Sequence, residues 1–94
     1  MTTFIMLGKY SQQAVKEMSP NRTEKAGNLI KKLEGKVKSI YATLGEHDVL
    51  FIVDFPTVQQ AMKASIAIGK LTGISFSTSA AVPIEEFDKM ISET

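Results

Sequence analysis

The sequence predicts an α+β fold in which strands and helices follow the order β-α-β-β-α-β, with a short helix at the C-terminal end. Two observations carry this prediction: apolar runs of strand length alternate with stripes of apolar residues at helical spacing, and the strongest strand, residues 48–55, directly follows a turn. The chain has 94 residues and no cysteine, so we expect one small domain over residues 1–94 that no disulfide supports.

The chain opens with a strand and continues into helices. Residues 2–9 are β-branched or apolar up to Gly8, which predicts the first strand. Ser11 can open a short helix, and the pair Ser19–Pro20 is a second helix start, because a capping serine precedes proline at the first helical position. The helix that follows carries one apolar stripe, formed by Ala26, Leu29, Ile30 and Leu33.

A second strand is expected over residues 36–43. Gly35 stands where a left-handed residue would end the preceding helix. Alternation along the strand places Val37, Ser39 and Tyr41 on the same face. Residues 44–47 form a turn before the third strand.

The second half of the chain repeats the pattern of strand, helix and strand. Residues 48–55 are almost continuously apolar, and Thr57 can cap the helix that follows Pro56. Gly73 ends that helix, residues 74–82 form a strand rich in Ser and Thr, and Pro83 begins the last helix. The acidic pair Glu85–Glu86 suits the N-terminal end of that helix.

This order is the split βαβ pattern of a ferredoxin-like fold. Right-handed crossovers place the first and third strands in the middle of a four-stranded antiparallel sheet with the helices on one face. The composition agrees, since the two central strands are apolar on both faces and the two edge strands carry lysine or hydroxyl residues.

The two main helices can cover only one face of this sheet. The central strands would therefore expose a second apolar set on the open face, and each Å² of apolar surface left in water forfeits roughly 25 cal/mol. Pairing with the same face of a second copy removes this cost, so we expect a homodimer, a dimeric α/β barrel, formed through the open sheet face.

The composition narrows the classes of partner. The formal net charge is +1, which does not fit a nucleic-acid-binding surface. No apolar run reaches the roughly 18 residues of a membrane span, and the first residues lack the pattern of a signal peptide. We therefore expect no nucleic acid and no membrane as partners, and a cytoplasmic location.

Few residues in the sequence have side chains that could catalyse a reaction or bind a metal ion. With one histidine, no cysteine and scattered carboxylates, we expect no metal site and no cofactor. His47 is a candidate general base that titrates near neutral pH, and Asp48 is a candidate for orienting it. The alternatives are structural: His47 caps nearby backbone in the turn, and Asp48 bonds backbone amides there.

Candidate ligand-binding residues are Tyr41, Ser39 and Tyr10, with the Tyr41 phenol directed between sheet and helices. The alternative for a buried tyrosine is an ordinary core residue with a satisfied hydroxyl. The methionines, among them Met62 and Met90, are assigned to a pliable core rather than to a binding groove.

Residues 36–56, Lys-Val-Lys-Ser-Ile-Tyr-Ala-Thr-Leu-Gly-Glu-His-Asp-Val-Leu-Phe-Ile-Val-Asp-Phe-Pro, resemble the motif of the GYD domain family. Gly45 and Asp48 match the motif, while His47 stands where the family commonly has tyrosine. The resemblance extends over nearly the whole chain. It implies the fold of the dimeric α/β-barrel proteins and dimerisation, and it implies no activity.

Three functions from different classes fit these residues. The first is a homodimeric ligand-binding or sensor module that holds a small, mostly apolar molecule between sheet and helices. The second is a cofactor-free monooxygenase or isomerase with His47 as general base and Tyr41 or Ser39 on an enolate oxygen, with haem binding through His47 as a variant. The third is a structural assembly unit without a ligand.

Overall fold

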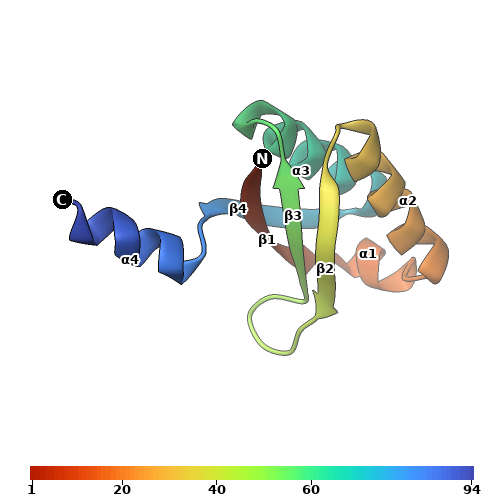
Figure 1. Ribbon diagram of the computed structural model, residues 1–94. Helices are drawn as coiled ribbons and strands as arrows, with labels where there is room; N and C mark the ends of the chain where they lie inside the picture. Colours follow the sequence, from red (N-terminus) through yellow and green to blue (C-terminus); the bar gives the residue numbers. More distant parts are fainter.

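The computed structural model describes residues 1–94 and shows four strands and four helices (Figure 1). The strands form one antiparallel sheet in the order β2-β3-β1-β4, so β1 and β3 lie in the centre, as predicted. The elements in chain order are β1 (Thr2–Tyr10), α1 (Gln12–Lys16), α2 (Pro20–Lys32), β2 (Lys36–Ala42), β3 (Val49–Phe55), α3 (Val58–Thr72), β4 (Ile74–Ala81) and α4 (Ile84–Ser92).

Hydroxyl side chains begin the first three helices, as the sequence predicts. The side-chain oxygens of Ser11, Ser19 and Thr57 accept hydrogen bonds from backbone amides three residues ahead, at 3.0, 3.1 and 3.3 Å. Gly73 ends α3 in the left-handed conformation, with φ of 77°. The bounds of these helices are therefore local properties of the sequence.

The core lies between the sheet and helices α2 and α3. The largest fully buried side chains come from both layers: Met6, Val53 and Phe55 from the central strands, Ile30 from α2 and Ile68 from α3. Phe55 also meets Phe4 edge to face, with ring centroids 6.0 Å apart. The predicted arrangement, a four-stranded antiparallel sheet with helices on one face, is confirmed.

A β-bulge in β2 changes which residues share a face. The pairing with β3 shifts between Val37 and Ser39, so Val37 pairs with Val53 whereas Ser39 pairs with Ile52. Val53 faces the helices and Ile52 faces away from them, so Val37 lies on the opposite face from Ser39 and Tyr41. The prediction that these three residues share a face is wrong, because the bulge inserts Lys38 into the alternation.

The left-handed residue after α2 is Glu34, with φ of 65°, and not Gly35 as predicted. Gly35 is needed for a different reason, which is close packing. A Cβ at this position would lie 2.5 Å from the Phe55 ring and 2.7 Å from a methyl group of Ile30. The missing side chain therefore lets the chain pass close over the core at the entry to β2.

Helix α4 projects from the end of β4, away from the rest of the chain (Figure 1). None of its residues is buried. None of the helices has the length and apolar character needed to cross a membrane.

Candidate functional site

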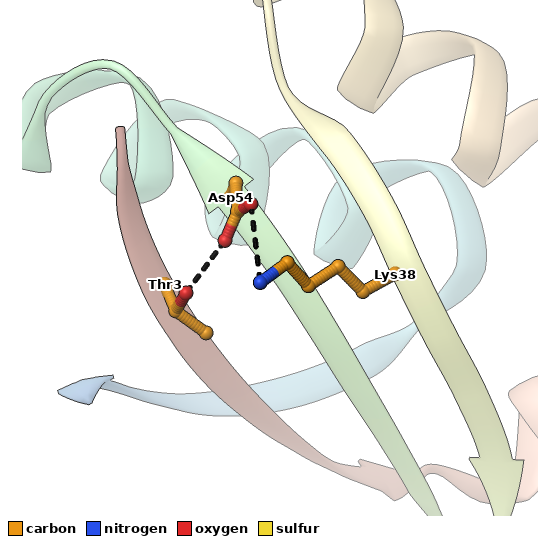
Figure 2. Close-up of polar contacts among 3 residues, drawn as sticks. All are labelled: Thr3, Lys38 and Asp54. Atoms are coloured by element: carbon orange, nitrogen blue, oxygen red, sulfur yellow. Dashed lines mark hydrogen bonds and ion pairs between the residues drawn. The ribbon is translucent and has the colours of Figure 1, made fainter. Parts of the chain in front are cut away.

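A polar cluster of three residues lies on the sheet face that the helices leave uncovered, which we call the open face. Thr3 from β1, Asp54 from β3 and Lys38 from β2 meet there (Figure 2). The Thr3 hydroxyl donates to Asp54 Oδ1 at 2.6 Å, and Lys38 Nζ lies 3.4 Å from Asp54 Oδ2. The Thr3 hydrogen bond, helped by the Lys38 charge, lowers the pKa of Asp54 below its ordinary value, against the opposing effect of burial.

The rest of the open face is apolar in its centre. Ile5 and Leu7 of β1 lie beside Ile52 and Leu50 of β3, and all four side chains are only partly buried. Of the predicted ligand-binding residues, Ser39 and Tyr41 also lie on this face, paired with Ile52 and Leu50. The Tyr41 side chain is 55% exposed and does not point between sheet and helices.

Tyr10 and Asp48 meet at the opposite end of β1 from Thr3. Asp48 Oδ2 accepts a hydrogen bond from the Tyr10 backbone amide at 2.8 Å, and the Asp48 amide donates to the Gly8 carbonyl at 2.8 Å. Asp48 thus ties the β2–β3 turn to the end of β1. This contact agrees with the structural alternative for Asp48, although its partner amide belongs to β1 rather than to the turn.

His47 is partly buried in the same turn. Its carbonyl accepts a hydrogen bond from the Thr43 hydroxyl at 2.7 Å. The structure records no hydrogen bond of its ring, either to backbone or to the Asp48 carboxylate. The catalytic role of His47 and Asp48 therefore stays a prediction.

Tyr10 borders a small cavity between the sheet and α2. Its ring lies under the Arg22 guanidinium, 5.3 Å from the ring centroid, and Arg22 also donates to the Ala14 carbonyl. The cavity measures about 40 Å³, room for little more than a water molecule. No group of three or more His, Asp or Glu residues lies close enough to hold a metal ion.

A larger apolar groove of about 260 Å³ lies between α3 and the strands β1 and β4, on the helix-covered side. We call it the α3 groove. Six of its eight lining residues are apolar. The lining residues are Phe4, Val58, Ala61, Met62, Ser65, Ile66, Phe76 and Thr78.

Two hydroxyl groups supply the polar part of the α3 groove. Ser65 Oγ donates to the Ala61 carbonyl at 3.0 Å and lies 2.7 Å from Thr78 Oγ1. Because the single Ser65 hydrogen is used by Ala61, Thr78 must donate to Ser65. The Thr78 oxygen then keeps free lone pairs with which to accept one more hydrogen bond.

None of the site residues predicted from the sequence lines the α3 groove. Met62, which we assigned to the core, lies at the groove and is 59% exposed. One signal for the groove was present: Val58, Met62 and Ile66 repeat every four residues, beside a separate stripe of buried residues that includes Ala61, Ala64 and Ile68. A helix with apolar residues outside its core stripe points to a second contact.

Solved structures of several regulators share the fold. The leucine response regulatory protein LrpA of Mycobacterium tuberculosis aligns with a TM-score of 0.58 and 12% identity over 87% of this chain and 51% of its own. A feast or famine regulatory protein from M. tuberculosis, solved in complex with L-methionine, aligns with a TM-score of 0.58 and 12% identity over 88% of this chain and 51% of its own. The chain thus spans about half the length of these neighbours, and the likeness concerns the fold.

No curated protein matches the chain. A family model matches it over residues 4–91, which includes β2, β3 and β4, all of β1 except its first two residues, and almost all of the last helix. That model describes the GYD domain, the family whose motif residues 36–56 resemble. The chain therefore belongs to the GYD domain family.

Proposed function

We propose that this protein is a small homodimeric ligand-binding module that holds a mostly apolar molecule in the α3 groove. The observation that carries this proposal is the groove itself, a hollow of about 260 Å³ between sheet and helix with an apolar lining and one hydroxyl pair. Apolar concave sites with a few placed polar groups are typical of small-molecule binding.

The hydroxyl pair defines the chemistry of the ligand. Thr78 Oγ1 can accept one hydrogen bond, and no charged side chain lines the groove. A ligand with an apolar body and a single hydroxyl or N–H donor therefore matches it. A carboxylate or ammonium group would lose its hydration there without gaining a partner of opposite charge.

A structural neighbour solved with L-methionine supports a ligand-binding function for a domain of this fold. The α3 groove predicts a different preference, because free methionine carries two charges and the groove lining carries none. Comparing the binding of an apolar hydrogen-bond donor with the binding of methionine therefore tests the proposed chemistry of the α3 groove, and not only whether a domain of this fold binds ligands.

The homodimer is proposed to form through the open face. Ile5, Leu7, Leu50 and Ile52 provide an apolar centre, and covering it removes that surface from water. The one carboxylate on this face, Asp54, already has partners in Thr3 and Lys38. A second copy can therefore cover the centre of the face without burying an unpaired charge, while Lys9 and Lys36, near the ends of their strands, stay exposed at its margin.

The test is a titration of the protein with indole, an apolar bicycle with one N–H donor, followed by amide chemical shifts in NMR. We expect the largest shifts at the lining residues of the groove, namely Phe4 and residues within 58–66 and 76–78, and at least about tenfold weaker binding of L-methionine. Thr78→Ile should abolish the indole shifts, because it fills the groove and removes the acceptor oxygen while keeping a β-branched residue in β4.

The matched control is Ala80→Ile. Ala80 lies on the same face of the same strand as Thr78 but does not line the groove, so indole binding should persist. Shifts that survive in Thr78→Ile, or that gather elsewhere on the molecule, would contradict the proposal. Wild-type protein without localised shifts at millimolar indole would contradict it equally.

A further inference from the structure

Helix α4 has an apolar side that no other part of the chain covers. Ile84, Phe87, Met90 and Ile91 share one side of the helix and are 45% to 63% exposed. An isolated helix below about 12–15 residues is marginal in water, and α4 has nine. The helix therefore needs a packing partner to be stable.

The α3 groove offers a surface of matching length. Its outer edge on α3 is formed by Val58, Met62 and Ile66, which are 55% to 60% exposed. At 1.5 Å per residue this edge is about 12 Å long, and the stripe from Ile84 to Ile91 is about 11 Å long. Two apolar helix stripes of this kind pack when they are brought together.

The charges of the two helices are complementary. Helix α3 carries Lys63 and Lys70 and no acidic residue. Helix α4 carries Glu85, Glu86 and Asp88 against the single base Lys89. On the helical wheel the two lysines fall beside the Val58–Ile66 stripe, and Asp88 and Glu86 fall on either side of the α4 stripe. Docking would thus place opposite charges at the margin of an apolar contact.

The link to α4 prevents the helix from docking on its own groove. The groove runs back along β4 from Ala81 toward Phe76, so the chain would have to reverse direction within Val82 and Pro83. Pro83 has φ of −58° and ψ of 146°, and a residue before proline is held extended. Both link residues are therefore extended, and an extended link carries the chain onward rather than back over β4.

We infer that α4 of one protomer packs over the α3 groove of a second copy of this chain. The helix exchange uses α3, β4 and α4, so it is separable from the open-face contact by mutation. The exchanged helix closes the groove from outside and makes the ligand site a composite of two chains. This last consequence rests on the proposed function, whereas the exchange itself does not.

The test uses cysteine cross-linking, for which the natural chain provides a background without thiols. Met62→Cys places a thiol at the groove, and Met90→Cys places one on α4. Both side chains are more than half exposed, so neither substitution disturbs the core. The two single variants are purified separately, mixed, oxidised mildly and analysed as non-reduced full-length protein. Met90→Cys mixed with Leu44→Cys, a fully exposed loop position, is the matched control.

We expect covalent heterodimers of Met62→Cys with Met90→Cys at several times the yield of the control pair. Equal yields would overturn the inference. So would a double variant carrying both cysteines that closes its disulfide within one chain, since this outcome requires docking in cis. Indole binding provides the separate readout: cross-linking without any indole binding leaves the exchange standing and rejects only the proposed ligand site.

Discussion

The two faces of the sheet are made by the same central strands, yet they differ in burial. In β3, Val53 and Phe55 point toward the helices and are fully buried, whereas Leu50 and Ile52 point to the open face and are partly buried. Alternation supplies apolar residues to both faces, but only one is covered by α2 and α3. Folding therefore buries the apolar side chains of the covered face, and those of the open face remain available for association.

The largest expected effect contrasts Phe55→Ala with Ile52→Ala in β3. Removing the Phe55 ring should lower the free energy of unfolding by about 3–5 kcal/mol, because the cavity that the ring leaves would lie in the core between the sheet and the helices. Ile52→Ala should cost clearly less at low protein concentration, since its side chain keeps contact with water. Urea denaturation at one fixed low concentration measures both, and equal losses would refute the distinction between the faces.

An intermediate effect is expected from Ile52→Lys on association. A lysine in the centre of the open face would place a charge in the proposed dimer contact, so the variant should lose this contact and associate more weakly than the wild type. Light scattering coupled to size-exclusion chromatography measures this directly. Asn28→Lys adds the same charge on an exposed position of α2 and should leave association unchanged. A dimer of Ile52→Lys as stable as the wild type would place the contact elsewhere.

The smallest effect concerns the polar cluster of the open face. The pKa of Asp54 is lowered in the folded protein, so its stabilisation is present above the ordinary value of 3.8 and is lost as pH falls through the folded value. Asp54→Asn keeps an acceptor for Thr3 but loses the Lys38 charge interaction. Because the Lys38 side chain is 51% exposed, the variant should lose less than about 1 kcal/mol at pH 7.

The pH dependence separates this charge effect from a change in packing. The difference in unfolding free energy between wild type and Asp54→Asn should shrink as pH falls below about 4, where the wild-type carboxylate becomes protonated. Urea denaturation at several pH values follows it, with Asp88→Asn on exposed α4 as the control. A difference that stays constant down to about pH 2.5 would mean that the carboxylate charge contributes nothing.

The sequence was sufficient for most of the fold. Caps at Ser11, Ser19, Thr57 and Gly73 are short-range signals, and each appears in the structure at its predicted place. The strand order followed from the handedness of the crossovers and the composition of the strands. The sequence did not predict two local features of the packing. These are the β-bulge at Lys38 and the close approach of the chain to the core that requires Gly35.

The candidate site was much less predictable. His47 and Asp48 attracted attention because of their chemistry, yet Asp48 bonds the Tyr10 amide and the His47 ring makes no hydrogen bond. The α3 groove is formed by Val58, Met62 and Thr78, residues that individually resemble core or edge positions. A groove depends on which surfaces meet and how completely they fill the space between them, and residue type alone does not encode this.

The sequence by itself determined the elements, their order and the division of apolar residues between two sheet faces, because periodicity and capping act over a few residues. Only the tertiary structure decided that Val37 faces the helices, that Ser65 meets Thr78, and that α4 has no partner within its own chain. These facts depend on strand register and on the angle at which layers meet. Both are set by packing between residues distant in sequence, so no local pattern contains them.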